Sequence, residues 1–555
     1  MPDISRMDRT SRVGRARGVD WAHVAGCTLV LAAIGYGIWL RFDGLDRKVV
    51  WVDEVATFLH LSGHGETELA ALSGSEAHQV GALLDTFQRG DGAIDRVVAF
   101  AVLGEPQMGG WYTLARLWSG LGGTEVVAWT RGLSAVASTV ALLLLYLVAR
   151  RLGASATMPA LAVALAAVSP LQIRYAQEAR AYATWSALVL GAILCLLKAR
   201  ERGGMAAWSA FAVLLAASLW TQPLTVLLLL PFAVLALMPG GDTHAPAKPR
   251  EGVRSASLVP FVAANGVALL AWLPWVWAIA ANRDAASVAT VWSGARADPG
   301  ALARARAWLG VLTSIFFRPA GEGGLLTALA SPERVLVLAL WLASGLGVLV
   351  LVVLALRDLS RNVSEPACGF LLALAAVPFL TLAAADLLLG GRRSTVDRYL
   401  LPSWTAIELI VAIYLTAVPR ARWRALVAVA VLALGAATGA RTRLLPVWWN
   451  TDLDALRQLL AVSDRLAGQR DLVIVTDLEP FPLLQLAHRL NGAAELRLGA
   501  AAVPGIAADE WPRVALVQPS DELLDVVRRA AGAERRVVRP EEALPIWRVA
   551  GAGGG

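Results

Sequence analysis

Residues 132–149 read GLSAVASTVALLLLYLVA, and Arg150 and Arg151 follow directly. This stretch holds no charged residue and has about the length that a helix needs to cross a ~30 Å hydrocarbon core. Comparable apolar stretches occur at about 21–40, 132–149, 156–173, 182–198, 205–219, 223–239, 258–280, 334–356, 366–387, 399–418 and 424–440. The sequence therefore predicts a polytopic α-helical membrane protein with about eleven transmembrane helices.

The composition supports this class and argues against a soluble protein and against a nucleic-acid-binding protein. Of the 555 residues, 57% are hydrophobic and 17% are charged, which is too apolar for an ordinary soluble chain. The net charge of +7 sits in short basic clusters between the apolar stretches, as membrane topology predicts, so we expect no nucleic-acid partner. Cys27, Cys195 and Cys368 lie within apolar stretches, without the spacing of a disulfide framework or a metal site.

The distribution of basic residues predicts the orientation. Several arginines precede the first apolar stretch, and we interpret residues 1–20 as a basic cytoplasmic N-terminus followed by a retained anchor. If that end is cytoplasmic, alternate loops should be rich in Lys and Arg. These loops hold Arg150 and Arg151; Lys198, Arg200 and Arg202; Lys248, Arg250 and Arg254; Arg357 and Arg361; and Arg420, Arg422 and Arg424. The chain is therefore predicted to be a multi-pass protein of the cell membrane.

The remaining loops form the outer face of the predicted membrane module at 21–440. Two of them are long, at 41–131 and 281–333, and residues 106–118 of the first predict a helix at the membrane interface. After residue 440 the hydropathy falls: 471–476 and 513–518 predict strands, whereas 480–490 and 521–531 predict helices. We therefore expect a small extracytoplasmic α/β domain at 441–550, followed by a disordered tail at 551–555.

Three clusters of ionisable residues lie on the predicted outer face, and the first is WVDEVAT at residues 51–57. Partial desolvation raises the proton affinity of a carboxylate, so Asp53 or Glu54 near an apolar surface would suit a general base. The alternative is that both carboxylates form a solvated helix cap.

The second cluster is RYAQEARAY at residues 174–182, between the third and fourth predicted helices. If Glu178 opens a helix, Glu178 and Tyr182 share one face, with Arg174 and Arg180 near the turn. Arginines next to Gln177 and Tyr182 could bind a phosphate through bidentate donors. The alternative is an interfacial aromatic residue flanked by snorkelling arginines.

The third cluster is RRSTVDRYLLP at residues 392–402, entering the tenth predicted helix from outside. Arg392, Arg393 and Arg398 run against the excess of basic residues expected on the cytoplasmic face, so topology does not explain them. Binding of an anion by these arginines would explain their presence on the outer face.

Taken in this order, the three clusters resemble motifs of the GT-C superfamily of integral membrane glycosyltransferases. The branch they resemble most contains the protein O-mannosyltransferases and the aminoarabinose transferases of lipid A (glycosyltransferase family 39-like). That branch has an Asp-Glu pair in its first outer loop, an Arg-Tyr-x-Gln-Glu-Ala-Arg-x-Tyr type segment and an Arg-Tyr-Leu-x-Pro type segment. These correspond to residues 53–54, 174–182 and 398–402, within a resemblance that covers roughly residues 20–420.

The resemblance implies an enzyme that moves a hexose or pentose from a polyprenyl-phosphate donor to an extracytoplasmic acceptor, which could be a cell-envelope glycan, a lipid or a protein. Asp53, with Glu54 beside it, matches the catalytic position, as a general base in an inverting displacement. The donor-phosphate positions fall on Arg174, Arg180, Tyr182, Arg393, Arg398 and Tyr399, and further site candidates are Gln177 and Glu178.

One segment departs from the family pattern. Many relatives carry a His-Pro-Pro-Leu-Tyr type segment in the first loop, whereas residues 105–112 here read EPQMGGWY. Glu105 therefore becomes a candidate for acceptor contact. We assign no cofactor. A divalent metal is left open, because His60 and His64 are four residues apart near Asp53 and could bind a metal if that stretch is helical. The alternative, which we favour, is that both are ordinary polar residues of a loop.

Two other classes of function are compatible with many spans. A transporter or flippase of lipid-linked saccharides would share the basic outer face, but transporters commonly show internal repeats and ionisable residues near the bilayer midplane. We find no convincing repeat, and the charges gather at one surface. A noncatalytic scaffold that displays the C-terminal domain would leave the groups at Asp53, Arg180 and Arg398 unexplained.

Overall fold

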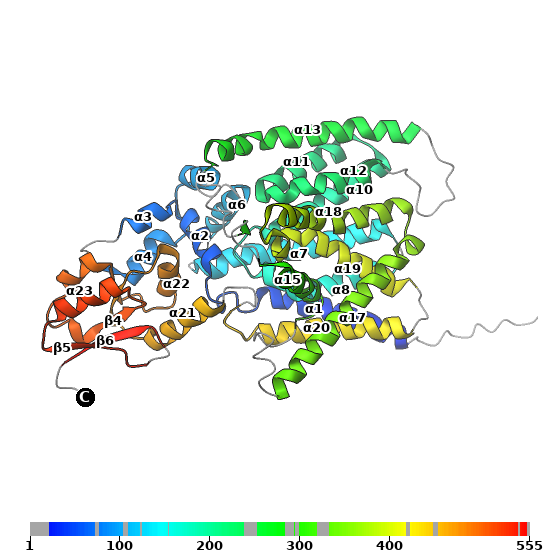
Figure 1. Cartoon of the computed structure of the whole chain (residues 1–555). Coiled ribbons are helices and arrows are strands. Elements are labelled where there is room, and N and C mark those ends of the chain that lie inside the picture. Colours follow the sequence, from blue (N-terminus) through cyan, green and yellow to red (C-terminus); the bar gives the residue numbers. More distant parts are fainter. Residues whose placement is uncertain are drawn as a thin grey trace, which may run out of the picture.

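The protein is described by a computed structural model that combines a large helical module with a small sheet domain (Figure 1). The described residues are 21–72, 77–103, 109–122, 125–153, 155–237, 252–283, 293–294, 299–318, 332–417, 422–447, 453–541 and 544–551. The predicted polytopic helical fold with a C-terminal α/β domain is confirmed. The predicted N-terminus at 1–20, residues 552–555 of the predicted tail at 551–555, and Glu105 lie outside the described residues. Gly551, which was predicted to belong to the disordered tail, is instead the last residue of strand β6.

Every predicted span coincides with a helix or a pair of consecutive helices. These are α1 (Trp21–Phe42), α7 (Val126–Leu152), α8 (Met158–Val168) with α9 (Pro170–Ala176), α10 (Tyr182–Arg202), α11 (Met205–Thr221), η1 (Pro223–Leu228) with α12 (Leu229–Leu237), α13 (Gly252–Ala281), α17 (Pro332–Asn362), α18 (Glu365–Leu389), α19 (Leu401–Thr416) and α20 (Arg422–Thr442). Within the described chain, eight helices are long and apolar enough to cross a membrane, or nine if α8 and α9 form one bent span. The segments Met205–Thr221 and Pro223–Leu237 are apolar but shorter.

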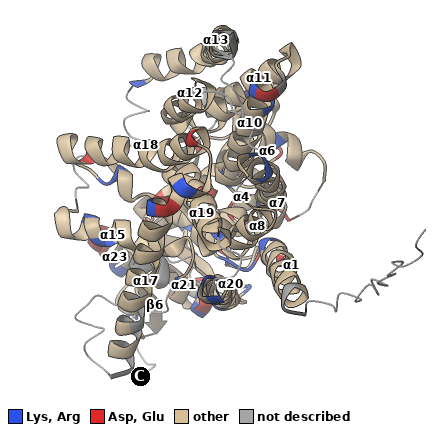
Figure 2. Ribbon diagram, turned by 90° about the vertical axis from the view of Figure 1, so that its right-hand side faces the viewer, with Lys and Arg blue, Asp and Glu red and all other residues tan. Residues whose placement is uncertain are grey.

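The centre of the helical module is formed by α8 and α19. All described α19 side chains from Leu401 to Leu415 are buried, as are nearly all those of α8. Peripheral helices expose large apolar side chains instead, such as Val259 and Leu270 on α13 and Leu346 on α17. Long stretches of these ribbons carry no Lys, Arg, Asp or Glu (Figure 2). An apolar outer surface of this extent suits contact with lipid.

A bend of 65° separates α8 from α9. The bend sets the direction of α9, in which the second cluster (residues 174–182) begins. Pro170 lacks the N–H that would continue the α8 hydrogen-bond ladder, and the Ser169 hydroxyl accepts from the Gln172 amide at 3.4 Å to begin α9. Buried Arg41 of α1 donates to the carbonyl oxygens of Ala166 (3.0 Å) and Ala167 (2.7 Å) at the end of α8. These bonds satisfy carbonyl oxygens that the bend leaves without helical partners. α9, which holds Arg174, can therefore run in a different direction from α8.

Arg41 and Glu408 are ionisable residues buried within the helical module, and Glu408 lies away from the surface at which such groups were expected to gather. Arg41 is 0% exposed, and Glu408 in the middle of α19 is also 0% exposed. Glu408 accepts from Gln172 Nε2 at 3.3 Å. The hydropathy pattern did not reveal Glu408 because one charge hardly lowers the mean hydropathy of a twenty-residue stretch.

The long first loop is folded rather than extended. It contains α2 (Val52–Leu61), α3 (Glu66–Ala70), β1 (Ala77–Gln79), α4 (Val80–Phe87), α5 (Ile94–Leu103) and α6 (Gly109–Ser119). The helix predicted at 106–118 corresponds to α6, and the second long loop contributes α15 (Ala301–Ser314). Figure 1 shows α2, α3 and α4 beside the C-terminal domain, at one end of the helical module.

The C-terminal domain contains a mixed six-stranded sheet of order β1-β3-β2-β4-β6-β5. Its elements are α21 (Leu453–Leu466), β2 (Val473–Thr476), α22 (Pro480–Ala487), β3 (Glu495–Leu498), η6 (Ala500–Gly505), η7 (Trp511–Arg513), β4 (Val514–Val517), α23 (Asp521–Ala531), β5 (Arg535–Val538) and β6 (Ile546–Gly551). Both predicted strands and both predicted helices are present. The edge strand β1 comes from the first loop and pairs antiparallel with β3, so this domain is not made of 441–550 alone.

Candidate active site

The three sequence clusters meet at one carboxylate. Asp53 lies in the first turn of α2, Arg180 in the turn before α10, and Arg398 in the short 3-10 helix η5 (Asp397–Leu400). Arg398 Nη2 lies 3.5 Å and Arg180 Nε 3.8 Å from the same oxygen, Asp53 Oδ2. The Asp53 side chain remains 22% exposed, whereas both arginine side chains are largely buried. A carboxylate that solvent can reach, between two fixed cations, is the central feature of the site.

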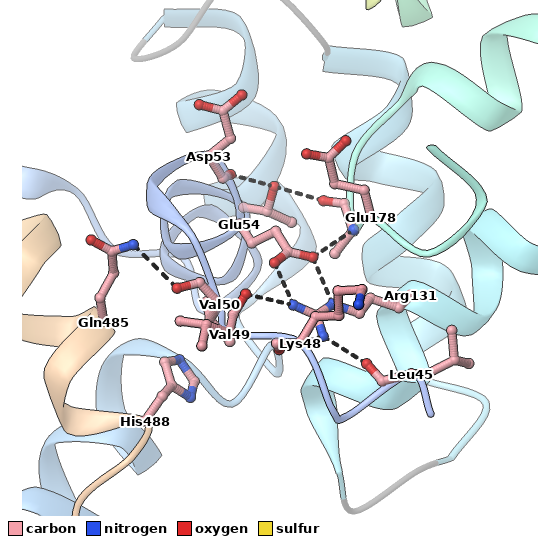
Figure 3. Close-up of polar contacts among 12 residues, drawn as sticks. Leu45, Lys48, Val49, Val50, Asp53, Glu54, Arg131, Glu178, Gln485 and His488 are labelled. Carbon is pink, nitrogen blue, oxygen red and sulfur yellow. Dashed lines mark hydrogen bonds and ion pairs between the residues drawn. The ribbon is translucent and has the colours of Figure 1, made fainter. Parts of the chain in front are cut away.

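Glu54, the neighbour of Asp53, is committed to a buried ion pair. Arg131 Nε donates to Glu54 Oε1 at 2.7 Å, Nη2 donates to Oε2 at 2.5 Å, and the Ala179 amide donates to Oε1 at 2.9 Å. Arg131 also donates to carbonyl oxygens of the lead-in to α2, at Leu45, Lys48 and Val49. In Figure 3, Asp53 points away from this pair, in the same direction as Glu178. We propose a positioning role for Glu54 instead of the expected catalytic one.

Arg180 is held by groups from the first loop. Its Nη1 donates to the Tyr112 hydroxyl (2.9 Å), the Asp53 carbonyl (3.1 Å) and the Thr57 hydroxyl (3.3 Å). The His60 ring stacks on Tyr112 with centroids 4.8 Å apart. This packing fixes the guanidinium beside Asp53. Thr57 and Tyr112 had no role predicted from sequence, because only the fold brings them to Arg180.

Arg398 lies among aromatic rings. Its guanidinium carbon is 5.5 Å from the ring centroid of Trp51 and 5.8 Å from the centroids of Tyr182 and Tyr399. Aromatic faces attract a cation, most strongly where water is excluded. Tyr182 and Tyr399, predicted to belong to the phosphate site, therefore line the position of Arg398.

Arg174 lies behind these groups and is fully buried. Its Nη1 is 3.5 Å from Asp397 Oδ2, its Nη2 is 3.6 Å from Glu178 Oε1, and the Tyr175 hydroxyl donates to Asp397 Oδ1. Asp397 thus links the second and third clusters, although no role was predicted for it from sequence. A buried cation between two carboxylates is well placed to balance the charge of the site.

Burial raises the pKa of Glu178 to about 7, against the opposing effect of Arg174. Both carboxylate oxygens of Glu178 are buried without hydrogen-bond donors from the described chain. The folded protein therefore holds a proton on Glu178 at pH values where the unfolded chain, with a value near 4.5, has released it. The stability due to this proton is full below about pH 4.5 and falls as the pH rises to about 7.

We therefore expect Glu178→Gln to raise the melting temperature at pH 8 by a few degrees, and to change it little at pH 5, where the parent carboxyl is protonated. Thermal unfolding of the purified protein at both pH values provides the measurement. A variant that melts below the parent at pH 8 would show that the ionised form of Glu178 stabilises the fold.

Gln177 and Arg393 contact the backbone or a helix end rather than Asp53. Gln177 Nε2 donates to the carbonyl oxygens of Leu40 (2.6 Å) and Asp43 (2.8 Å). Arg393 Nη1 is 3.2 Å from Asp386 Oδ1 at the end of α18. Asp386 also accepts from the amides of Arg393 and Ser394, which shapes the short 3-10 helix η4 (Arg393–Thr395) just before Arg398. A positioning role suits both residues.

The histidine pair of the first loop does not converge on one point. His60 Nδ1 is 2.6 Å from the Ala56 carbonyl oxygen of its own helix, and His64 Nδ1 is 2.5 Å from Glu68 Oε2. Within the described chain, no group of three or more His, Cys, Asp or Glu side chains is arranged to hold a metal ion.

No protein-family model matches the chain, and no curated protein sequence matches it. Among solved structures, the chain is similar to ArnT from Cupriavidus metallidurans in the apo state, with 11% identity over 95% of this chain and 98% of that chain and a TM-score of 0.48.

Two further solved structures are similar to this chain. One is the archaeal oligosaccharyltransferase AglB from Archaeoglobus fulgidus, in complex with an inhibitory peptide and a dolichol-phosphate (14% identity, 85% of this chain, 65% of that chain, TM-score 0.44). The other is the arabinofuranosyltransferase AftD from Mycobacteria (14% identity, 95% of this chain, 40% of that chain, TM-score 0.41).

Proposed function

We propose that this protein is a membrane glycosyltransferase of the GT-C type that moves a sugar from a polyprenyl-phosphate carrier to an extracytoplasmic acceptor. One observation carries the proposal: an accessible carboxylate, Asp53, lies within 4 Å of the guanidinium groups of both Arg180 and Arg398. The three residues come from three separate motifs of the resemblance, and their chemistry is complementary.

Asp53 serves as the general base in this proposal. The acceptor hydroxyl oxygen attacks the anomeric carbon and forms the new glycosidic bond, while the bond from that carbon to the carrier phosphate oxygen breaks. The hydroxyl proton moves to Asp53, and the carrier leaves as a polyprenyl phosphate with its negative charge. A single displacement of this kind inverts the anomeric centre.

The arginines stabilise the leaving phosphate. Arg180 is fixed by Tyr112 and Thr57, and Arg398 lies among aromatic rings, so neither must reorganise greatly when charge develops on the phosphate. Preorganised donors in a site of low dielectric are the most effective stabilisers of such charge. The fully buried Arg174 adds positive charge behind them.

The site lies at the end of the helical module next to the C-terminal domain (Figure 1). We propose that this end faces outward and that the N-terminus is cytoplasmic, because the basic loops alternate in that register. A carrier lipid could then keep its chain in the bilayer and its sugar phosphate at the surface. The carboxylate and the arginines of this site are compatible with transfer of a hexose or a pentose. They are also compatible with a glycan, a lipid or a protein as the acceptor.

Transfer can be tested directly with purified protein in lipid nanodiscs. A panel of polyprenyl-phosphate hexoses and pentoses would be offered with an extract of cell-envelope acceptors, and release of polyprenyl phosphate would be measured. We expect release with at least one donor, in an acceptor-dependent manner. No turnover of any donor, together with unaltered lipid-linked sugars in a strain lacking the protein, would contradict the proposal.

Transport of lipid-linked saccharides is the second candidate, and one observation favours it. Arg41 and Glu408 are buried within the helical module, where transporters commonly place ionisable residues. Arg41, however, bonds to backbone carbonyls at the bend between α8 and α9, which is a structural use of its charge. Movement of a labelled lipid-linked saccharide across proteoliposomes, without cleavage of the sugar phosphate, would support transport over transfer.

A further inference from the structure

The C-terminal domain contacts the catalytic segment through α22, a contact that the proposed reaction does not require. α22 packs against α2, and its side chains from Leu483 to Ala487 are buried. Gln485 Nε2 donates to the Val50 carbonyl at 3.2 Å, three residues before Asp53. Figure 3 shows Gln485 and His488 approaching the start of α2 from one side, while Arg131 approaches from the other.

His488 forms the second contact through Gln88. The Gln88 amide nitrogen donates to the carbonyl oxygens of Phe87 (2.9 Å) and Val55 (3.4 Å), so its oxygen is the acceptor for His488 Nε2 at 3.0 Å. The imidazole must then carry its proton on Nε2. The ring also lies against Phe58 of α2, with centroids 6.0 Å apart. His488 therefore reaches α2 both through Gln88, at Val55, and directly, at Phe58.

The protonation of His488 suits this bond over a wide range of pH. Burial and, to a smaller extent, the nearby charge of Arg131 together lower the pKa of His488 to about 4. The neutral ring, with one nitrogen donating, is thus the form present at neutral pH. Gln485 and Gln88 are uncharged amides, so the whole contact is free of net charge.

The lead-in to α2 is also bound to the chain that enters the C-terminal domain. The Val49 amide donates to the Pro446 carbonyl at 2.8 Å, and Lys48 Nζ donates to the carbonyl oxygens of Thr442 and Leu445. Residues 48–50 are therefore held by the C-terminal part of the chain on one side and by Arg131 on the other.

We propose that the C-terminal domain positions Asp53, with Gln485 and His488 as positioning residues that hold the first turns of α2 against the membrane module. The proposal rests on the function proposed above. Arg180 and Arg398 are carried by the membrane module, so a shift of α2 changes the distance from Asp53 to both arginines. A displacement of about 1 Å is enough to cost up to roughly 10²-fold in rate.

The experiment compares Gln485→Ala, His488→Leu and the double variant with the parent protein in nanodiscs. We expect the double variant to lose about tenfold or more in kcat while its Kd for a polyprenyl-phosphate donor stays near that of the parent, because the phosphate arginines are untouched. His488→Gln, which keeps a donor to Gln88, should recover most of the rate that His488→Leu loses.

Gln469→Ala is the matched control. Gln469 lies in the same domain, donates to the Arg465 carbonyl and accepts from Arg548, and within the described part of the chain it makes no hydrogen bond to α2. We expect parental kcat from this variant. Equal loss in Gln469→Ala and Gln485→Ala would indicate general damage to the domain and overturn a specific role for α22.

Hydrogen exchange separates this proposal from the proposed function. In the double variant the α2 amides at 52–61 should exchange at least several-fold faster, and the α23 amides at 521–531 should keep their parental rate. If the parent catalyses no transfer, the exchange result still decides whether α22 holds α2. Parental exchange in α2 would overturn the proposal, and so would parental kcat in the double variant of an active enzyme.

Discussion

Asp53→Asn is expected to lower sugar transfer by about 10²–10⁴-fold, the usual contribution of a positioned general base. Asparagine has nearly the size of aspartate but cannot take up the proton of the acceptor's hydroxyl group at neutral pH. The partly exposed Asp53 side chain meets Arg398 and Arg180 at 3.5 and 3.8 Å, distances longer than a tight ion pair. Insertion and melting temperature should therefore change little, and donor affinity should be retained or rise slightly, because a negative charge beside the phosphate is removed.

Glu54→Gln is the matched control for this experiment, since it makes the same change at the adjacent residue. It leaves the buried charge of Arg131 without its carboxylate partner, which typically costs about 3–5 kcal/mol of stability. We therefore expect a clear fall in melting temperature from Glu54→Gln and a loss of turnover with normal stability from Asp53→Asn. An Asp53→Asn protein that turns over at more than about a tenth of the parental rate would remove Asp53 from the role of base.

Arg398→Ala is expected to lower kcat by about 10²–10³-fold, as the loss of a preorganised donor to a developing anion does elsewhere. The leaving phosphate would lose one of the two guanidinium groups beside Asp53. Donor affinity should fall more than acceptor affinity, because only the donor carries the phosphate. Separate titrations of donor and acceptor against the purified variant would measure both.

Arg180→Ala should show the same preference for the donor, together with a loss of stability that Arg398→Ala does not share. Arg180 also bonds to Tyr112, Thr57 and the Asp53 carbonyl, and its removal frees part of the first loop. Arg398→Lys gives a further check, since lysine keeps the charge but not the planar fork and should recover only part of the rate. Unchanged donor affinity in both alanine variants would place the phosphate elsewhere.

The membrane module was predictable from sequence because a span is a local property. About twenty apolar residues in a row identify a helix whatever surrounds it, and all the predicted stretches became helices. The bend between α8 and α9 was not predicted, although Ser169-Pro170 was a usable signal. A proline within an apolar stretch is tolerated in many membrane helices, so the direction of the chain after it depends on partners such as Arg41.

The residues of the candidate site were predictable only where they form short motifs. Asp53, Arg180 and Arg398 belong to such motifs, and the structure brings both arginine side chains within 4 Å of the Asp53 carboxylate. Arg131 and Tyr112 belong to none. Arg131 precedes an apolar stretch and resembles any basic residue near a membrane boundary, although it holds Glu54 and the lead-in to α2. Their roles arise from contacts between segments far apart in sequence, which no local pattern encodes.

The C-terminal sheet shows the same limit. Every residue of β2 and β4 is buried. Both strands were predicted because each is a largely apolar segment in the sequence. β1 has three residues, Ala77–Gln79, with no alternation long enough to indicate a strand. It forms because β3 offers an open edge, to which it adds antiparallel.

The pairing of β1 with β3 also sets an order of events during synthesis of the chain. Residues 77–79 emerge from the ribosome before the membrane helices from α7 to α20, and residues 495–498 emerge after them, so these helices must be made before this edge of the sheet can close. Contacts over such a separation form slowly and late. A ribosome that stops before α22 would leave a membrane module in which α2 lacks the contacts made by Gln485 and His488. Assembly of the proposed site thus waits until the chain has been made as far as His488.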